Sequence, residues 1–202
     1  MTEYAILCEK ASAAKNFASA LGGTSGEFEG HSYKIVHSHG HLMEFVDPKE
    51  QVPEDKAAQY RSWKLEHLPW QVADFSWEKQ PIMAKNPRTG RKKSTKSDLV
   101  EIKKNVKDCD ALVIATDVDP SGEGELLAWE IINAIKWRKP VKRLYFADEE
   151  ARSIQAGFRE IKPISSQQSD GDYLKSDARS KWDFLSMQLT RIATTVTKQA
   201  GY

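Results

Sequence analysis

Acidic residues stand at two places in the sequence where an apolar segment ends. Asp117 and Asp119 follow the apolar segment ALVIAT, and Glu9 follows the apolar segment YAILC. Mg²⁺ prefers oxygen ligands, and proteins usually hold it with one or two carboxylates together with water and substrate phosphates. Crowded carboxylates repel one another unless a cation relieves them. These acids therefore indicate a site for a hard divalent cation.

An Asp-x-Asp pair in front of a helix also has a structural interpretation. Asp side chains commonly cap helix N-termini, where they accept backbone N–H groups and offset the helix dipole. Taken alone, the pair favours capping over metal binding. The segment 117–125 carries four acids, and Glu9 adds another at a different strand end, which favours the cation site. Both interpretations stay open at this point.

Alternating strands and helices must position these acids. Short apolar runs predict buried strands, and apolar residues at helical spacing predict amphipathic helices. Strands are predicted at 4–8, 33–36, 111–116 and 141–147, helices at 11–21, 99–106, 123–137, 148–160 and 172–198, and an irregular segment at 48–81. Gly122 and Gly124 should let the backbone turn tightly before the helix at 123. Strands separated by helices imply an α/β fold with a mostly parallel sheet flanked by helices. In such sheets, chemistry sits at the carboxyl ends of the strands.

The composition excludes several classes of protein. The chain has 202 residues, of which 40% are hydrophobic and 29% charged, so it is neither disordered nor membrane-embedded. Glu9 and Lys10 interrupt the first apolar segment, so we expect no signal peptide. Cys8 and Cys109 do not make a disulfide framework. We therefore expect a cytoplasmic protein with no membrane partner.

A net charge of +1 conceals a strongly basic segment. Between Ala84 and Lys107 nine basic residues are opposed only by Asp98 and Glu101. A basic segment on an otherwise acidic body can bind a polyanion locally. The alternative is a solvated loop that leads into a helix.

Three segments in this order, ILCEKASAAKNFASALG, HSHGHLMEF and ATDVDPSGEGELLAWEI, resemble the Toprim domain of type IA DNA topoisomerases, with the topoisomerase III branch most similar. In that family a first strand ends in Glu-Lys-Pro-Ser, a Gly-His-Leu segment follows, and Asp-x-Asp-x-x-Gly-Glu comes last. A later segment, YLKSDARSKWDFLSMQLTRIATT, resembles the start of the next domain. The resemblance implies a Rossmann-like Toprim domain at 1–160. It also implies the first helices of an adjoining DNA-binding helical domain at 161–202, in a fragment of a longer chain.

The resemblance also implies a function. The family cleaves and religates one DNA strand through a 5′-phosphotyrosine with Mg²⁺, which changes DNA topology. None of the tyrosines here lies in the family's nucleophile motif, so the nucleophile is expected outside this chain and the fragment is expected to be inactive alone. The expected partners are a single-stranded DNA segment at the cleavage site and the remaining domains of the same polypeptide. The expected location is cytoplasmic and nucleoid-associated.

Site residues are carried over from the family position by position. Glu9 matches a proposed general acid or base, Lys10 a residue that stabilises phosphate charge, and His41 the histidine of the Gly-His pair near the active site. The remaining matches are Asp117 and Asp119 for the Mg²⁺-binding pair and Arg179 and Arg191 for residues facing DNA phosphate.

The acidic motif departs from the family pattern Asp-x-Asp-Arg-Glu-Gly-Glu. Without a gap, Pro120 and Ser121 replace Arg-Glu, and Glu123 takes the final glutamate position. With two inserted residues, Glu123 and Glu125 match Glu-Gly-Glu instead. Glu123 is acidic in both alignments, so it is the expected third metal ligand, with Glu125 less certain. Ala11 also replaces the usual proline after Glu-Lys.

Two other functions stay open. A Toprim-type nuclease, primase or recombination module shares the Glu and Asp-x-Asp residues, although it lacks the HGHL segment and the Ala-Arg … Thr-Arg helix. A non-catalytic DNA-binding module would use the acids as helix caps and the basic segment for affinity. Metal binding separates these alternatives from the first interpretation.

Overall fold

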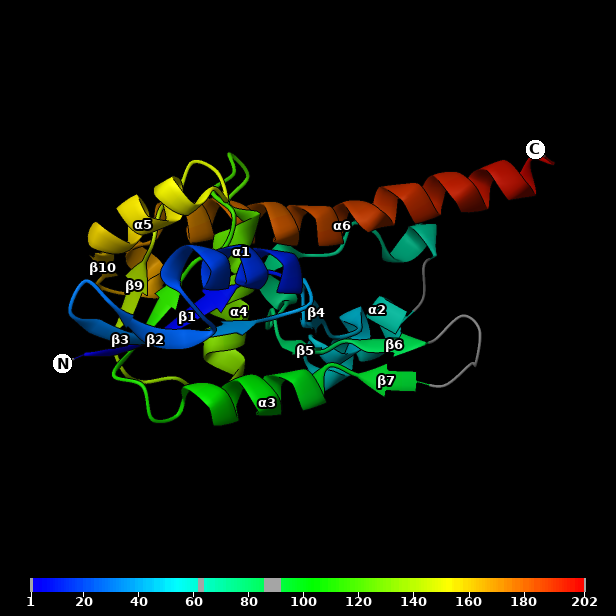
Figure 1. The fold of residues 1–202 in the computed structure, drawn as a ribbon. Helices are drawn as coiled ribbons and strands as arrows, with labels where there is room; N and C mark the ends of the chain where they lie inside the picture. The colour runs from blue at the N-terminus through cyan, green and yellow to red at the C-terminus, as the bar shows by residue number, and fades with distance from the viewer. Residues whose placement is uncertain (1, 62–63, 86–91, 202) are drawn as a thin grey trace. The chain divides into compact units, whose positions relative to one another are not determined.

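The apolar segments form one six-stranded sheet, in the order β10-β9-β8-β1-β3-β2 (Figure 1). This computed structural model describes residues 2–61, 64–85 and 92–201. The strands of the sheet are β1 (Glu3–Cys8), β2 (Ser25–Phe28), β3 (His31–His37), β8 (Ala111–Ile114), β9 (Val141–Arg143) and β10 (Lys162–Ile164). β9, β8, β1 and β3 pair in parallel, whereas the edge strands β2 and β10 pair antiparallel. The predicted mostly parallel sheet is confirmed.

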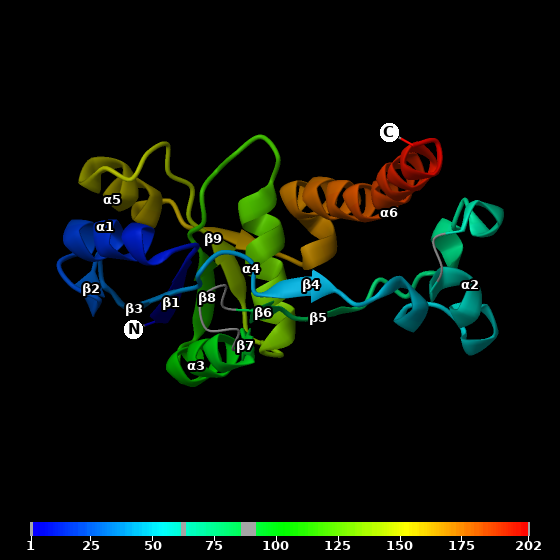
Figure 2. The ribbon, with the colours of Figure 1, turned by 90° about the vertical axis from the view of Figure 1, so that its right-hand side faces the viewer.

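Helices cover both faces of this sheet. They are α1 (Ala11–Leu21), α3 (Lys96–Val106), α4 (Glu123–Ala134) and α5 (Ala151–Arg159). Phe17 of α1 and Ile154 of α5 belong to one core, and Ile102 of α3 and Ile131 of α4 belong to the other. Figure 2 shows α1 and α5 on one side of the strands and α4 on the other. Because both faces are covered, β8 is buried at all four positions, which explains its unbroken apolar sequence.

The described residues fall into two compact units. Unit 1 is Met1–Met43 with Pro81–Ser176, and unit 2 is Glu44–Gln80 with Asp177–Tyr202. This division differs from the predicted segments 1–160 and 161–202. The reason lies in residues after 160, since β10 pairs with β9 and Asp170 accepts a hydrogen bond from Trp129 Nε1 at 2.8 Å.

Unit 2 contains little regular structure apart from one long helix. Its short elements are the 3₁₀ turns Pro48–Glu50, Glu54–Lys56, Leu65–His67 and Val72–Asp74 and the helix α2 (Ala57–Arg61). The long helix α6 (Gly171–Gln199) begins in unit 1 and contributes Phe184 and Leu185 to the core of unit 2. Tyr60, Trp70 and Phe75 form the centre of that core. Trp70 and Trp77 of the predicted irregular segment thus belong to a small core of their own.

Short strands complete the described structure. β4 (Met43–Phe45) pairs with β5 (Lys79–Pro81), and β6 (Met83–Lys85) pairs with β7 (Lys92–Ser94). The centre of the predicted basic loop, 86–91, lies outside the described residues. Among the helices of the described ranges, none has the length and apolar character needed to cross a membrane.

The predicted strand 141–147 ends earlier than its apolar pattern indicates. β9 stops at Arg143, while Leu144 and Phe146 remain buried in the core beneath α1 and α5. Leu144 N–H still donates to Ile114 O at 3.0 Å. The apolar residues after Arg143 are therefore buried, as the pattern indicates, although they do not continue the strand.

Candidate active site at the carboxyl ends of β1 and β8

The carboxyl ends of three neighbouring parallel strands meet at one edge of the sheet. A turn after β3 is fastened to the end of β1, because Ser38 N–H donates to Cys8 O at 3.1 Å and Ser38 Oγ–H donates to Glu9 O at 2.7 Å. Gly40 N–H also donates to Glu9 O at 3.2 Å, from a left-handed backbone with φ of 82°. The turn leads His41 to the edge where Glu9 and Lys10 leave β1.

Lys10 joins the ends of β1 and β8. Its Nζ lies 3.3 Å from Asp117 Oδ2, and both side chains are nearly half exposed. Asp117 raises the pKa of Lys10 through this hydrogen bond and its charge. Exposed pairs of this kind add about 0–1 kcal/mol to stability, so the contact is loose enough to be exchanged for a ligand.

Glu9 lies in an environment that favours its protonated form. Partial burial is the main cause that raises the pKa of Glu9, and the negative charges of Asp117 and Glu123 raise it further. Lys10 and His41 oppose that shift. A carboxyl group with a raised pKa can donate and accept a proton closer to neutral pH, as general acid–base catalysis requires.

His41 bridges two carboxylates of α4. Its Nε2 lies 3.2 Å from Glu123 Oε1, and its Nδ1 lies 3.2 Å from Glu130 Oε2. Glu130 is nearly buried, and its hydrogen bond to His41 is the largest cause that raises the pKa of His41. A protonated imidazole donates from both nitrogens, which satisfies both carboxylates at once.

Asp119 serves the start of α4. Its Oδ1 accepts from the backbone N–H of Ser121 at 2.7 Å and from the Ser121 hydroxyl. The Ser121 hydroxyl is the main cause that holds the pKa of Asp119 below its usual range, and backbone N–H groups of Gly122 and Gly124 contribute. The side chain of Asp119 thus holds the turn before α4, whose N-cap residue Gly122 has no side-chain capping bond. The metal-binding role of Asp119 stays a prediction.

Glu125 points into the fold. It forms an ion pair with Arg143, and both side chains are almost completely buried. Burial is the main cause that raises the pKa of Glu125, and the Arg143 guanidinium opposes it. Arg143 also donates to the backbone oxygens of Ile114, Thr116 and Leu144 at 3.1, 2.9 and 3.1 Å. Glu123, whose side chain is 58% exposed, is therefore the one of the two glutamates that is open to a ligand.

Two glycines of the predicted turn allow close backbone approaches. Gly122 has a left-handed backbone with φ of 72°, and a Cβ there would lie 2.3 Å from the backbone oxygen of Asp172. A Cβ on Gly124 would lie 2.6 Å from the backbone oxygen of Asp117. The predicted tight turn is confirmed, because neither position has room for a larger side chain.

The carboxylates at this sheet edge could supply some, but not all, of the ligands of a Mg²⁺ ion. Across the described residues, no three His, Cys, Asp or Glu side chains are already arranged as a metal-binding group. Mg²⁺ requires only one or two protein carboxylates when substrate phosphates supply other oxygens. Asp117 and Glu123 are exposed carboxylates, and both raise the pKa of Glu9, so their negative charge is incompletely balanced there. A divalent cation would relieve that imbalance.

The two arginines predicted to face DNA lie on α6, within unit 2. Both are exposed, and Arg179 Nε lies 3.7 Å from Asp183 Oδ2. They are twelve residues apart, which on an α-helix corresponds to about 120° of rotation and about 18 Å of rise. The structure thus places them on different faces of α6.

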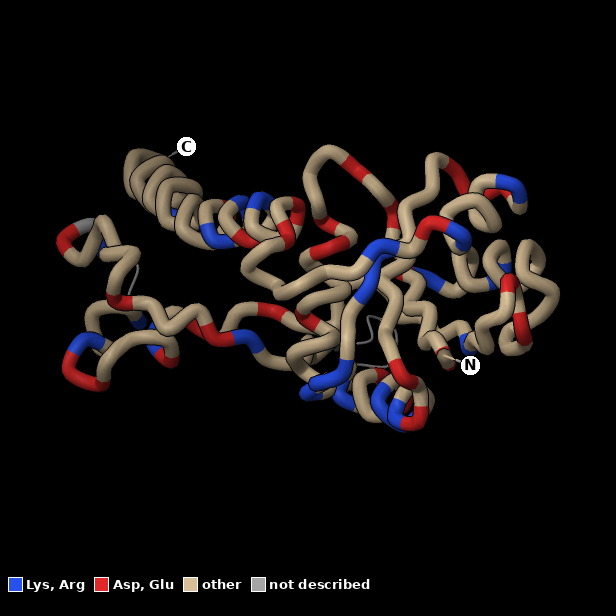
Figure 3. The backbone as a smooth tube through the Cα atoms, turned by 90° about the vertical axis from the view of Figure 1, so that its left-hand side faces the viewer, with Lys and Arg blue, Asp and Glu red and all other residues tan. Residues whose placement is uncertain are grey.

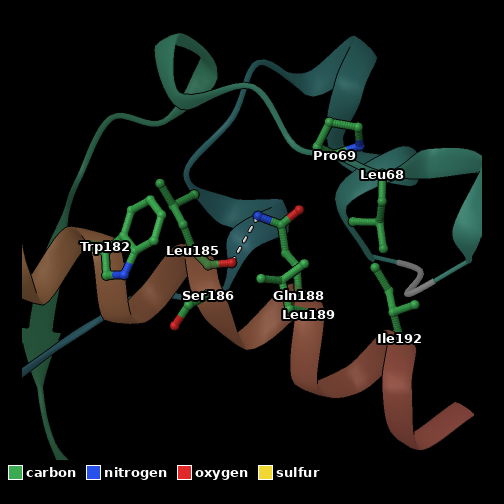
Figure 4. Close-up of a pocket in the computed structure, with 8 residues that line it drawn as sticks. All are labelled: Leu68, Pro69, Trp182, Leu185, Ser186, Gln188, Leu189 and Ile192. Carbon is green, nitrogen blue, oxygen red and sulfur yellow. Dashed lines mark hydrogen bonds between the residues drawn. The ribbon is translucent and has the colours of Figure 1, made fainter.

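Unit 2 also holds an apolar groove of about 410 Å³ (Figure 4). Side chains of α6 line one wall, and Leu68 and Pro69 line the other. Trp182 and Leu189 are 68% and 67% exposed. Gln188 marks the floor, where its side chain donates to Leu185 O at 3.0 Å and accepts from Trp70 N–H at 2.9 Å. The sequence patterns did not predict this groove.

Three site residues were missed by sequence reasoning. Glu130 and Arg143 lie within a helix and a strand, where no local signal identifies them as site residues. Glu149, whose carboxylate accepts a hydrogen bond from Asn16 Nδ2, could have been found. It follows the predicted strand 141–147, and its charge raises the pKa of Lys10.

Comparison with known proteins agrees with this geometry. The model of the Toprim domain family matches residues 4–148. Curated proteins named DNA topoisomerase 3 are similar over nearly the whole chain: 30% identical over 200 residues in Bacillus cereus, 32% over 201 in Shouchella clausii and 32% over 194 in Staphylococcus epidermidis. The predicted resemblance and the predicted Toprim-type, Rossmann-like α/β fold are confirmed.

These matches cover 96%, 96% and 94% of the chain, which itself spans 25% of the length of each of those relatives. Among solved structures, full-length topoisomerase I from Thermotoga maritima is 24% identical, with a TM-score of 0.49 over 79% of this chain and 21% of that one.

Proposed function

Because the chain belongs to the Toprim domain family, we propose that it forms the metal-binding part of a type IA DNA topoisomerase that cleaves and religates one DNA strand. The observation that carries the proposal is the meeting of Glu9, Lys10 and Asp117 at one sheet edge, in a chain similar to DNA topoisomerase 3 over nearly its whole length. The proposed partners are single-stranded DNA and the remaining domains of the same polypeptide. The proposed location is cytoplasmic and nucleoid-associated.

In the proposed reaction, a tyrosine from another part of the polypeptide gives its hydroxyl proton to water and attacks a DNA phosphorus atom. The bond from phosphorus to the 3′ oxygen breaks, a 5′-phosphotyrosine forms, and the 3′ oxygen takes up a proton. Glu9 is suited to give that proton and to take it back at religation, because its raised pKa favours the protonated form. Lys10 would offset negative charge on the phosphate.

Asp117 and Glu123 are the exposed carboxylates that would hold Mg²⁺, with Asp119 as the second predicted ligand of the Asp-x-Asp pair. Mg²⁺ bound there would supply positive charge that positions DNA phosphates. His41 would hold Glu123 in place through the hydrogen bond at 3.2 Å. Glu125 would act only through the fold, since it is buried against Arg143.

Mg²⁺ titration of the melting temperature tests this proposal. If 10 mM Mg²⁺ is about ten times the dissociation constant, binding stabilises the native chain by about 1.4 kcal/mol. For a chain of this size that raises the melting temperature by about 3–6 °C. Asp117→Asn should abolish the rise, and Asp108→Asn, an exposed acid outside the site, should keep it. No rise in the unaltered chain would contradict the metal site and favour a non-catalytic DNA-binding module.

DNA binding tests the two arginines of α6. Arg179→Ala and Arg191→Ala should each weaken binding of single-stranded DNA and lower the slope of log affinity against log salt by about 0.7. Lys198→Ala removes a charge from the same helix and serves as the control. Unchanged binding in both arginine variants would contradict their assigned role.

The apolar groove in unit 2 supports the proposal that further domains of a longer polypeptide pack on this chain. Exposed Trp182 and Leu189 side chains in one groove are typical of a surface that another segment covers. Trp182→Ser with Leu189→Ser should leave Mg²⁺ binding intact and prevent association with separately expressed domains. Association at unchanged affinity would contradict this use of the groove.

A further inference from the structure

One face of α3 gathers lysines without acids. At about 100° per residue, Lys96, Lys103 and Lys107 fall within about 40° of one another around the helix axis. Leu99 and Ile102, which are buried in the core against the sheet, lie about 60° and about 120° around the helix axis from the centre of this face. Figure 3 marks the lysines of this helix in blue along the lower edge of unit 1.

The acids of α3 are separated from this face. Asp98 and Glu101 line a small polar pocket together with His37 and His39, on the side of the helix toward β3. Among the described residues, no carboxylate lies within ion-pair distance of Lys96 or Lys103, and Lys107 approaches only its exposed neighbour Asp108, at 3.8 Å. The lysine face therefore presents uncompensated positive charge.

This arrangement does not serve the helix itself. Lysines near a helix C-terminus offset the dipole, which accounts for Lys103 and Lys107 alone. Lys96 is the first residue of α3, where the dipole disfavours a cation. Lys103 and Lys107 are also four residues apart, a spacing at which like charges repel. A local arrangement that costs stability without a structural gain is typical of a functional surface.

The lysine face is anchored at the start of the helix. Thr95 N–H donates to Ile82 O at 3.0 Å, and Thr95 Oγ1–H donates to Leu42 O at 2.6 Å. Ser97 Oγ–H donates to Ser94 O at 3.1 Å. These bonds attach the N-terminus of α3 to backbone next to His41, so the face has a defined position within unit 1.

We propose that the α3 lysine face, Lys96, Lys103 and Lys107, binds the phosphate backbone of duplex DNA. From Lys96 to Lys107 the helix rises about 16 Å, which spans about five phosphates of one duplex strand at about 3.4 Å each. The inference rests on the proposed function, in which the chain acts on DNA. It adds a contact that none of the predicted site residues makes.

Salt-dependent binding to a blunt duplex tests the inference. Each phosphate contact contributes about −0.9 to the slope of log affinity against log salt. Between 50 and 200 mM salt, the affinity of the unaltered chain should therefore fall about 40-fold more than that of a variant with Lys96→Gln, Lys103→Gln and Lys107→Gln. The matched control, Lys15→Gln, Lys136→Gln and Lys162→Gln, removes the same charge from exposed positions elsewhere in unit 1 and should keep the full slope. The α3 variant should melt no lower than the unaltered chain, because it loses repulsion.

The outcomes separate this inference from the proposed function. If the α3 variant and the control have equal slopes, or if the chain does not bind the duplex at all, the inference is wrong, whatever Mg²⁺ does to the melting temperature. If the α3 variant loses duplex affinity while Mg²⁺ has no effect, the lysine face stands and the metal site fails. Loss of binding to phosphatidylserine vesicles with unchanged duplex binding would assign the face to a membrane surface and overturn the inference.

Discussion

Acids that alternate along one short segment, 117–125, have opposite environments. Asp117 and Glu123 are exposed and form ion pairs with Lys10 and His41, two side chains of the same sheet edge. Asp119 accepts hydrogen bonds from Ser121 in the turn before α4, and Glu125 is buried against Arg143. The segment thus uses two acids to hold its own conformation and leaves two for a ligand. Each acid of this motif therefore has to be tested for its effect on stability and, separately, for its effect on ligand binding.

The largest expected effect is at Glu125. Glu125→Ala leaves the Arg143 guanidinium buried without its carboxylate, which should lower the free energy of unfolding by about 3–5 kcal/mol. Urea unfolding followed by circular dichroism measures it. Glu123→Ala, two residues away, should change the same free energy by less than about 0.5 kcal/mol. Equal losses in the two variants would erase the distinction between the buried and the exposed acids.

Asp119 should have an intermediate effect. Asp119→Ala removes the carboxylate that accepts from the Ser121 N–H and hydroxyl in the turn before α4, at a cost of about 1.5–3 kcal/mol for hydrogen bonds to a charged group. The pKa of Asp119 is lowered in the folded chain from a reference value of 3.8. Its stabilising contribution is therefore present above about pH 3.8 and is lost as the pH falls through the folded pKa. Thermal melting from pH 2.5 to 6 should show a smaller loss of stability at acid pH in Asp119→Asn, and an identical loss would contradict a stabilising role of the Asp119 carboxylate in this turn.

His41 should make a smaller contribution to stability, and that contribution should depend on pH in the opposite direction from that of Asp119. The pKa of His41 is raised in the folded chain above its reference value of 6.5. Its contribution is therefore complete below about pH 6.5 and is lost as the pH rises through the folded pKa. Between pH 6 and pH 9 the melting temperature of the unaltered chain should fall more than that of His41→Gln. Parallel curves would mean that Glu123 and Glu130 do not hold a protonated imidazole.

The smallest expected effect on the fold is at the Lys10–Asp117 contact. Both side chains are nearly half exposed, so Lys10→Met should change the free energy of unfolding by at most about 1 kcal/mol. If Lys10→Met lowered the free energy of unfolding as much as Glu125→Ala does, Asp117 would have a structural role and could not be counted among the acids left for a ligand. Chemical denaturation of Lys10→Met beside Lys15→Met, an exposed lysine of α1, measures the difference.

The sequence predicted the strands that are buried on both faces, because unbroken apolar runs such as ALVIAT have no other stable place in an α/β fold. It did not predict the edge strands. β2 is exposed at three of its four positions, and β10 contains Pro163, so neither carries an apolar run. Their pairing with β3 and β9 depends on contacts between distant residues.

The site was predictable at the strand ends and ambiguous inside the acidic motif. Glu9 and Asp117 follow apolar strands, which is a local signal. The choice between Glu123 and Glu125 depends on Arg143, which forms an ion pair with Glu125. Arg143 lies on β9, which comes after α4 in the chain, so the spacing within the acidic motif does not reveal this contact. The hydrogen bonds of Asp119 to Ser121 likewise belong to a turn that ends in a left-handed backbone at Gly122. Spacing alone does not determine which acids face inward.

The Arg143 guanidinium, which holds backbone oxygens of Ile114 and Thr116, makes the loop after β8 a preorganised element. Because the loop is ordered when the chain folds, a ligand at Asp117 need not restrict it further. The conformational entropy lost on association should therefore be small, and more of the contact energy should be available as affinity. Amide hydrogen exchange at Ala115, whose N–H donates to Leu7 O at 2.9 Å, should accordingly be slow before any ligand is added.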